Sequence, residues 1–209
     1  MAILNGSTGG NPPRSASRYL LRAVRIALWL AVAGGGALSF VGGVPGAAPS
    51  EPRYNGTLIE QTEALAPFDL VRADGRTFSI AETRGRVSLF AFGFTDCPDV
   101  CPTTLLELGN VQRRLGDRAG AVDVYLVTVD PERDSPDRLS QYVLRFGGNI
   151  VALTGTPDQL ERSYRAFGVY AERSGRSDEG QADVVHTAST YLVDGASRLR
   201  LVFPSGMHA

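Results

Sequence analysis

The residues best able to do chemistry in this sequence are its two cysteines, Cys97 and Cys101. Both lie in the stretch Phe92-Gly-Phe-Thr-Asp-Cys-Pro-Asp-Val-Cys-Pro-Thr-Thr. On a coiled turn, side chains four positions apart share one face, with Cβ atoms about 5–6 Å apart. Such a pair can close a disulfide or hold one soft metal ion between two thiolates. The spacing therefore leaves a redox role and a metal-binding role open.

The elements on either side place the two thiols on a bend. The apolar run Val87 to Phe92 predicts a buried strand, and an amphipathic helix follows from apolar residues at Leu105, Leu108, Val111 and Leu115. Pro102 suits the first turn of a helix, so we expect Cys101 at or just before the helix start. Unpaired N–H groups and the helix dipole at that end favour a thiolate over a thiol.

A histidine is the remaining candidate ligand. The sequence has two, His186 and His208, and the second falls in the last two residues, where we expect disorder. His186 follows a polar loop and could reach the cysteine turn, although a surface histidine without a role is the alternative. Two thiolates with one imidazole suit copper better than a hard cation. Zinc with one added water would satisfy the same ligands.

The rest of the chain alternates strands and helices. We predict a hairpin at 68–71 and 76–80, strands at 122–129 and 150–153, helices from Pro136 to Gly147 and from Pro157 to Gly168, a polar loop at 172–183, and a last hairpin at 187–193 and 199–203. This order predicts an α/β, thioredoxin-like fold with a central, mostly parallel sheet flanked by helices and a C-terminal antiparallel hairpin. Alternating Phe90, Phe92 and Phe94 indicate core packing.

Composition narrows the class of protein. The formal net charge of -1 gives no electrostatic case for a nucleic-acid partner. Hydrophobic residues at 43% and aromatics at 8% are enough for one core. Two cysteines are too few for a disulfide-stapled scaffold, so a purely structural disulfide on this strand-to-helix bend is the weaker reading of the pair.

The N-terminal part predicts membrane insertion. Residues 1–25 form a basic N-terminus ending in Arg18, Arg22 and Arg25, and the uncharged run 26–44 is long enough to span a bilayer. A retained anchor and a cleaved signal sequence both remain open, because residues 45–48 resemble a cleavage site. We predict a single-pass protein of the cell (inner) membrane, with a linker at 45–66 and a domain at 67–209 on the periplasmic side.

Four blocks, in order, resemble the Sco/SenC family of copper chaperones. They are residues 93–104, the run Val-Asp-Pro-Glu-Arg-Asp at 129–134, Leu-Thr-Gly-Thr at 153–156, and His-Thr-Ala-Ser-Thr-Tyr-Leu at 186–192. The resemblance implies a membrane-anchored, thioredoxin-like protein that binds Cu(I) or Cu(II) through Cys97, Cys101 and His186. It also implies help in assembling the binuclear copper site of cytochrome c oxidase, with the oxidase's copper-binding subunit and a thiol reductant or another copper carrier as partners.

The resemblance also bears on neighbouring residues. It implies that Asp130 lies near the metal, as an outer-sphere group or oxygen ligand, whereas a loop-starting aspartate is the alternative. The family usually has an acidic residue before the histidine, and this sequence has Val185 there. We expect Arg133 and Asp134 to form a local ion pair that shapes the loop.

Two further function classes stay open beside the chaperone. A thiol-disulfide oxidoreductase, which reduces the cysteines of a copper-receiving partner, would need both thiols but not His186. A peroxiredoxin-like peroxidase would need one activated cysteine beside an arginine. We do not expect a classical enzyme, and a thiol-disulfide reductase activity is the one that the cysteine pair allows.

Overall fold

The computed structural model describes residues 54–60, 63–176 and 182–206. The predicted basic N-terminus 1–25, the predicted membrane segment 26–44 and His208 lie outside these residues. Within the described ranges, no helix is long and apolar enough to cross a membrane.

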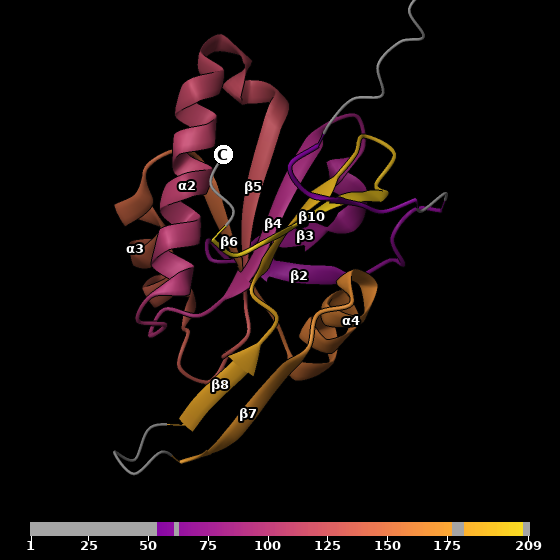
Figure 1. The fold of residues 1–209 in the computed structure, drawn as a ribbon. Coiled ribbons are helices and arrows are strands. Elements are labelled where there is room, and N and C mark those ends of the chain that lie inside the picture. The colour runs from indigo at the N-terminus through magenta and orange to yellow at the C-terminus, as the bar shows by residue number, and fades with distance from the viewer. Residues whose placement is uncertain (1–53, 61–62, 177–181, 207–209) are drawn as a thin grey trace, which may run out of the picture. The chain divides into compact units, whose positions relative to one another are not determined.

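The core of the fold is one eight-stranded sheet with the order β1-β10-β9-β4-β5-β6-β2-β3 (Figure 1). Its strands are β1 (Thr57–Leu58), β2 (Asp69–Arg72), β3 (Thr77–Ser79), β4 (Val87–Gly93), β5 (Val122–Thr128), β6 (Ile150–Thr154), β9 (Ser189–Val193) and β10 (Leu199–Pro204). The central strands β4, β5 and β6 run parallel. Every other pairing in the described sheet is antiparallel. The sheet is therefore mixed, not mostly parallel as predicted, because a hairpin extends the parallel centre on each side.

Among the described residues, three α-helices cover the two faces of the sheet: α2 (Val100–Leu115), α3 (Pro136–Val143) and α4 (Pro157–Phe167), with short 3-10 turns η1 (Ile80–Thr83), η2 (Gly116–Ala121) and η3 (Leu144–Phe146). Helices α2 and α3 pack with residues of one face, and α4 packs on the other, beside β2 (Figure 1). Phe90, Phe92 and Phe94 are all buried on the α4 side, which confirms their predicted core role.

Local capping explains where the predicted helices begin and end. The Ser135 hydroxyl accepts the Arg138 N–H at the start of α3. Thr156 and Gln159 form a capping box at the start of α4, and Gly168, with φ 67°, ends that helix. These signals are local, so the sequence located both helices.

The region predicted as a polar loop, 172–183, contains two strands where the structure describes it. Strands β7 (Ala171–Arg176) and β8 (Ala182–His186) form a separate two-stranded antiparallel sheet, with Ala171 opposite His186. In Figure 1 this ribbon extends away from the main sheet. Ala171 and Val184 of this ribbon pack against the core, but its sequence does not alternate apolar and polar residues, so the sequence did not predict these strands.

The folded unit begins before the predicted boundary at residue 67. Within the predicted linker 45–66, Thr57 pairs with Val202 of β10. Leu65 is buried, and its N–H donates to the Ser197 carbonyl at 2.8 Å. Both segments therefore belong to the domain.

Candidate metal centre

The two cysteines lie where the central strand β4 leads into α2. Residues 94–99, which we call the cysteine loop, join the strand to the helix, and Asp99 takes the N-cap position of α2. Cys101 is the second residue of the helix. Its backbone N–H donates to the Cys97 sulfur at 3.4 Å. The Cys97 side chain thus satisfies one of the N–H groups that a helix start leaves without an intrahelical partner.

The Cys101 thiol is buried against the end of β4. Its residue is 5% exposed, and a Cβ built on Gly93 would lie 2.8 Å from the Cys101 sulfur. Only glycine at position 93 therefore admits the sulfur here. Burial raises the pKa of the Cys101 thiol, and its contact with Cys97 adds to the shift. At Cys101 burial outweighs the expected effect of the helix dipole, so its thiol holds its proton in the reduced protein.

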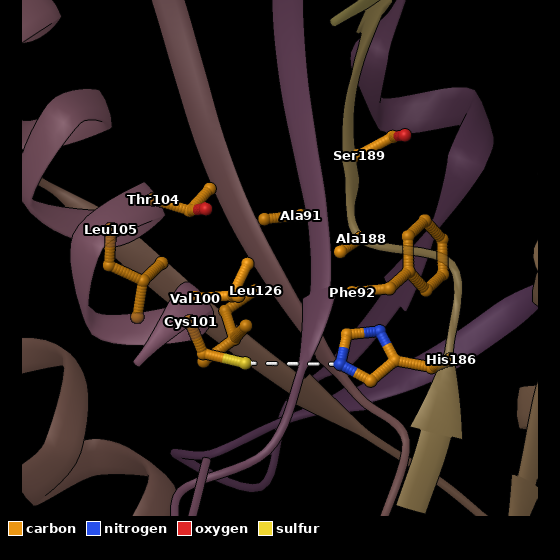
Figure 2. A pocket seen from close by; sticks show the side chains of 10 residues that line it. All are labelled: Ala91, Phe92, Val100, Cys101, Thr104, Leu105, Leu126, His186, Ala188 and Ser189. Carbon is orange, nitrogen blue, oxygen red and sulfur yellow. Dashed lines mark hydrogen bonds between the residues drawn. The ribbon is translucent and has the colours of Figure 1, made fainter. Parts of the chain in front are cut away.

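His186 faces Cys101 from a different element. It is the last residue of β8, and its Nε2 lies 4.0 Å from the Cys101 sulfur. Figure 2 shows the imidazole and the thiol pointing toward each other. If thiolate and imidazole bonds have the lengths seen on zinc, a shared ion would hold the two atoms roughly 3.5–3.8 Å apart. The observed separation is a few tenths of an ångström from that value.

The other nitrogen of His186 fixes the orientation of the ring. Nδ1 lies 3.1 Å from the Thr187 carbonyl oxygen. Because a carbonyl only accepts, this hydrogen bond requires the proton on Nδ1, which leaves the Nε2 lone pair toward Cys101. Burial lowers the pKa of His186, which favours the neutral ring. The Thr187 carbonyl thus orients the imidazole. Val185, at the position where the family that this sequence resembles usually has an acidic residue, is 55% exposed.

Cys101 and His186 line a small pocket of about 10 Å³, roughly the space of one water. Phe92, Leu126 and Val100 are among its other lining residues (Figure 2). Such a space holds an ion or a water but no organic substrate. In the described residues, no group of three His, Cys, Asp or Glu side chains is already gathered as a metal site.

Asp130 and Arg133 pair with each other, in an arrangement that differs from the predicted Arg133–Asp134 pair. Arg133 forms its ion pair with the fully buried Asp130, not with Asp134. The guanidinium also lies 5.8 Å from the centre of the Phe94 ring, and the Phe94 ring meets His186 edge-on at 5.9 Å. The predicted Arg133–Asp134 pair is wrong because the turn directs Arg133 back to Asp130, whose carbonyl accepts the N–H of both residues.

Sequence reasoning missed the polar side chains that tie the cysteine loop to its neighbours. Thr95 and Thr128 both donate to the Asp134 carboxylate. The signal that could have found them is positional, because Thr95 follows the end of β4 and Thr128 ends β5. Parallel strands bring their carboxyl ends to one edge, where such groups meet.

The fold and the site together define a class: thioredoxin-like α/β domains with a dithiol on the strand-to-helix turn and a histidine beside the second thiol. Comparison with known protein families narrows this class to one family. The chain belongs to the SCO1/SenC family, whose sequence model matches residues 56–209. The resemblance to Sco/SenC proteins is thereby confirmed.

Individual relatives agree with this placement. An SCO2-like protein of Rickettsia prowazekii is 35% identical over 133 residues, covering 63% of this chain and 65% of that protein. The chain thus spans slightly less than two thirds of that relative. A putative copper-binding protein of Stutzerimonas stutzeri is 33% identical over 147 residues, covering 70% of this chain and 72% of the other.

Solved structures show the same fold. Bradyrhizobium japonicum ScoI with copper bound has a TM-score of 0.63 at 34% identity, covering 67% of this chain and 88% of that one. The apo Sco1 protein of Thermus thermophilus has a TM-score of 0.67 at 33% identity, covering 74% and 89%. The described domain therefore shares its architecture with Sco proteins solved with and without copper.

Proposed function

We propose that this protein is a membrane-anchored, extracytoplasmic copper-binding protein that assists assembly of the binuclear copper site of cytochrome c oxidase. The observation that carries the proposal is the approach of His186 Nε2 to the Cys101 sulfur, 4.0 Å across two elements far apart in the sequence. Cys97 lies at the same helix start and supplies the third donor. Two relatives in the family were solved with copper bound, ScoI of Bradyrhizobium japonicum and yeast Sco1.

Copper is cargo in this proposal, held by Cys97, Cys101 and His186. Thiolate and imidazole donors suit copper in either common oxidation state and exclude hard cations. His186 is ready to bind without losing a proton, because its neutral form already presents Nε2. Cys101 must release its proton to solvent as the metal binds, and its sulfur then binds copper from a buried position.

The proposal is tested by titrating the reduced full-length protein in detergent with Cu(I) and Cu(II). We expect one equivalent of copper per chain and, for Cu(II), a thiolate charge-transfer band in the visible region. His186→Ala should weaken binding and abolish or shift the band, whereas Val185→Ala, its neighbour outside the ligand set, should leave both unchanged. An unaltered band in His186→Ala would remove the histidine from the ligand set.

The oxidase role needs a separate cellular test. In a host strain lacking its own SCO1/SenC gene, expression of the chain should restore copper loading and activity of cytochrome c oxidase. Cys97→Ser should not restore them. A fusion of an extracytoplasmic reporter to the C-terminal end tests the predicted topology, since activity of the reporter requires export of the domain.

A thiol-disulfide oxidoreductase is the second candidate, and the adjacency of the two sulfurs favours it. A Sco family member described with a disulfide switch is 26% identical to this chain, with a TM-score of 0.55. In such a reaction the two thiols pass two electrons and two protons to a partner's disulfide and become a disulfide themselves. This activity would survive His186→Ala and would vanish in Cys97→Ser, so the same variants separate the two functions.

A further inference from the structure

A buried carboxylate lies behind the cysteine loop and is used by none of the chemistry described so far. Asp134 is 1% exposed and sits just before α3. Its neighbour Arg133 pairs with Asp130. Burying a carboxylate costs several kcal/mol unless donors compensate it. The contacts of Asp134 therefore indicate what the residue is for.

Asp134 binds the cysteine loop through Thr95. The Thr95 N–H lies 3.2 Å from each carboxylate oxygen, and the Thr95 hydroxyl donates to Oδ1 at 2.5 Å. The Thr128 hydroxyl donates to Oδ2 at 2.6 Å. Hydroxyl-to-carboxylate distances of about 2.5–2.7 Å are those of charge-assisted hydrogen bonds, roughly twice as strong as neutral ones.

These bonds join three segments at the carboxyl ends of the parallel strands. Thr95 follows β4 and lies two residues before Cys97, and Thr128 is the last residue of β5. Thr128 also accepts the Asp130 N–H at 3.0 Å. The Asp134 carboxylate thus links the cysteine loop to the end of β5 by hydrogen bonds.

We propose that Asp134 is a positioning residue that fixes the cysteine loop, and through it the placement of Cys97 relative to Cys101. The inference rests on the proposed function only in taking these two thiols as the working pair. Without the Asp134 bonds, Thr95 loses its interior anchor. Phe94 still holds the start of the loop in the core, and beyond Thr95 the Asp96–Arg138 ion pair on the surface ties the loop to α3. An exposed pair of this kind holds a loop weakly.

Loosening the cysteine loop should lower the effective concentration of the Cys97 thiol at Cys101, which can be measured. A loop held in one arrangement brings Cys97 to Cys101 without further ordering, whereas a loosened loop must be ordered each time a disulfide closes. In a glutathione buffer, the dithiol and oxidised glutathione give the protein disulfide and two reduced glutathione molecules. Loosening the loop lowers the equilibrium constant of this exchange.

The experiment compares Asp134→Asn, Thr95→Val and Thr95→Ser in the metal-free full-length chain. Asp134→Asn keeps the shape but replaces one accepting oxygen by a donor that faces the Thr128 hydroxyl. We expect its disulfide equilibrium constant to fall about tenfold, which raises the reduction potential by about 30 mV for a two-electron couple. Thr95→Val should shift it in the same direction. Thr95→Ser restores the hydroxyl and should return to within about twofold of the parent.

Asp137→Asn is the matched control, because it makes the same charge change on the exposed first turn of α3. It should leave the potential unchanged. If Asp134→Asn fails to fold, the Thr95→Val and Thr95→Ser pair decides. Potentials for the folded variants that all match the parent would overturn the inference, as would a Thr95→Ser protein that behaves like Thr95→Val.

A second readout separates this inference from the proposed function. On adding Cu(II), Asp134→Asn should give a charge-transfer band that is shifted or weakened relative to the parent. If the parent holds no copper, the proposed function fails, while the potentials still test Asp134. If the parent holds copper and Asp134→Asn matches it in both band and potential, the function stands and the inference fails.

Discussion

Gly93 decides how closely the Cys101 sulfur approaches strand β4. A Cβ at this position would lie 2.8 Å from the sulfur, so Gly93→Ala must push the thiol away from the strand. We expect a loss of about 1–3 kcal/mol in the free energy of unfolding, as for other overpacked cores. We also expect weaker copper binding.

Gly120→Ala is the control for this change, because nothing lies within 4 Å of a Cβ at Gly120. Urea unfolding of the two variants, followed by copper titration, measures both effects. Equal stabilities and equal copper affinities would mean that the Cys101 side chain moves aside at no cost, contrary to the packing described above.

Removing the hydroxyl group should change the melting temperature in opposite directions at two buried tyrosines. The hydroxyl of Tyr142 has no hydrogen-bond partner among the described residues, whereas the Tyr164 hydroxyl donates to the Thr128 carbonyl at 2.8 Å. Removing an unsatisfied polar group is neutral or stabilising, and removing a bonded one costs about 0.5–1.5 kcal/mol. Tyr142→Phe should therefore keep or raise the melting temperature, and Tyr164→Phe should lower it. The reverse ranking in calorimetry would contradict both assignments.

At the residue scale, the sequence predicts candidate ligands but not the contacts around them. Spacing and residue type were enough to single out Cys97, Cys101 and His186 as candidates. The partners of Asp130, Arg133 and Asp134 could not be predicted, because which carboxylate an arginine meets in a tight turn depends on backbone dihedrals. Gly93 also gave no signal, since its role comes from a sulfur on another element.

At the scale of elements, the β2–β3 hairpin has a turn whose ion pair responds to pH. A hydrogen bond from Arg76 lowers the pKa of Asp74. A carboxyl with a lowered pKa in the folded state adds stability above its unfolded value, near 3.9, and this stability is lost as the pH falls through the folded value. Asp74→Asn should therefore destabilise the protein at pH 7, and the difference from the parent should shrink as the pH falls through the lowered pKa of Asp74.

The size of that effect is small because both side chains are exposed and screened by water. Melting temperatures of the parent and Asp74→Asn at pH 7, 4 and 2.5 measure it. A difference of the same size at all three pH values would show that the turn, and not the charge of Asp74, is responsible.

Elements with local signals were predicted well. Ser135 and Thr156, each followed by a proline, located α3 and α4 closely, because a cap acts within one turn of chain. The β7–β8 ribbon was missed because its strands form a sheet of their own and their sequence does not alternate apolar and polar residues. The mixed character of the sheet was missed for another reason: where a hairpin docks is decided by long-range packing, as in the pairing of β2 with β6.

At the scale of the whole molecule, copper should join segments that are otherwise separate. Cys97 and Cys101 sit on the strand-to-helix turn, and His186 sits on the β7–β8 ribbon. A ligand that binds only the folded state raises stability by about 2.7 kcal/mol at a free concentration one hundred times its dissociation constant. Copper should therefore raise the melting temperature of the reduced protein, and a Cu(I) chelator should reverse the rise.

The same gain should be smaller in His186→Ala, because the ribbon no longer takes part. Differential scanning calorimetry with and without copper measures the two gains. Equal gains would mean that the metal is held within the cysteine turn alone.

The two cysteines differ in depth: Cys97 is partly exposed and Cys101 is buried. A protein that exchanges a metal ion or a disulfide with this domain must therefore meet the Cys97 sulfur before the Cys101 sulfur. A metal ion or a partner thiol would then reach the Cys97 sulfur first on binding and leave it last on release. The difference in depth between neighbouring sulfurs gives the exchange a direction of approach before any partner has docked.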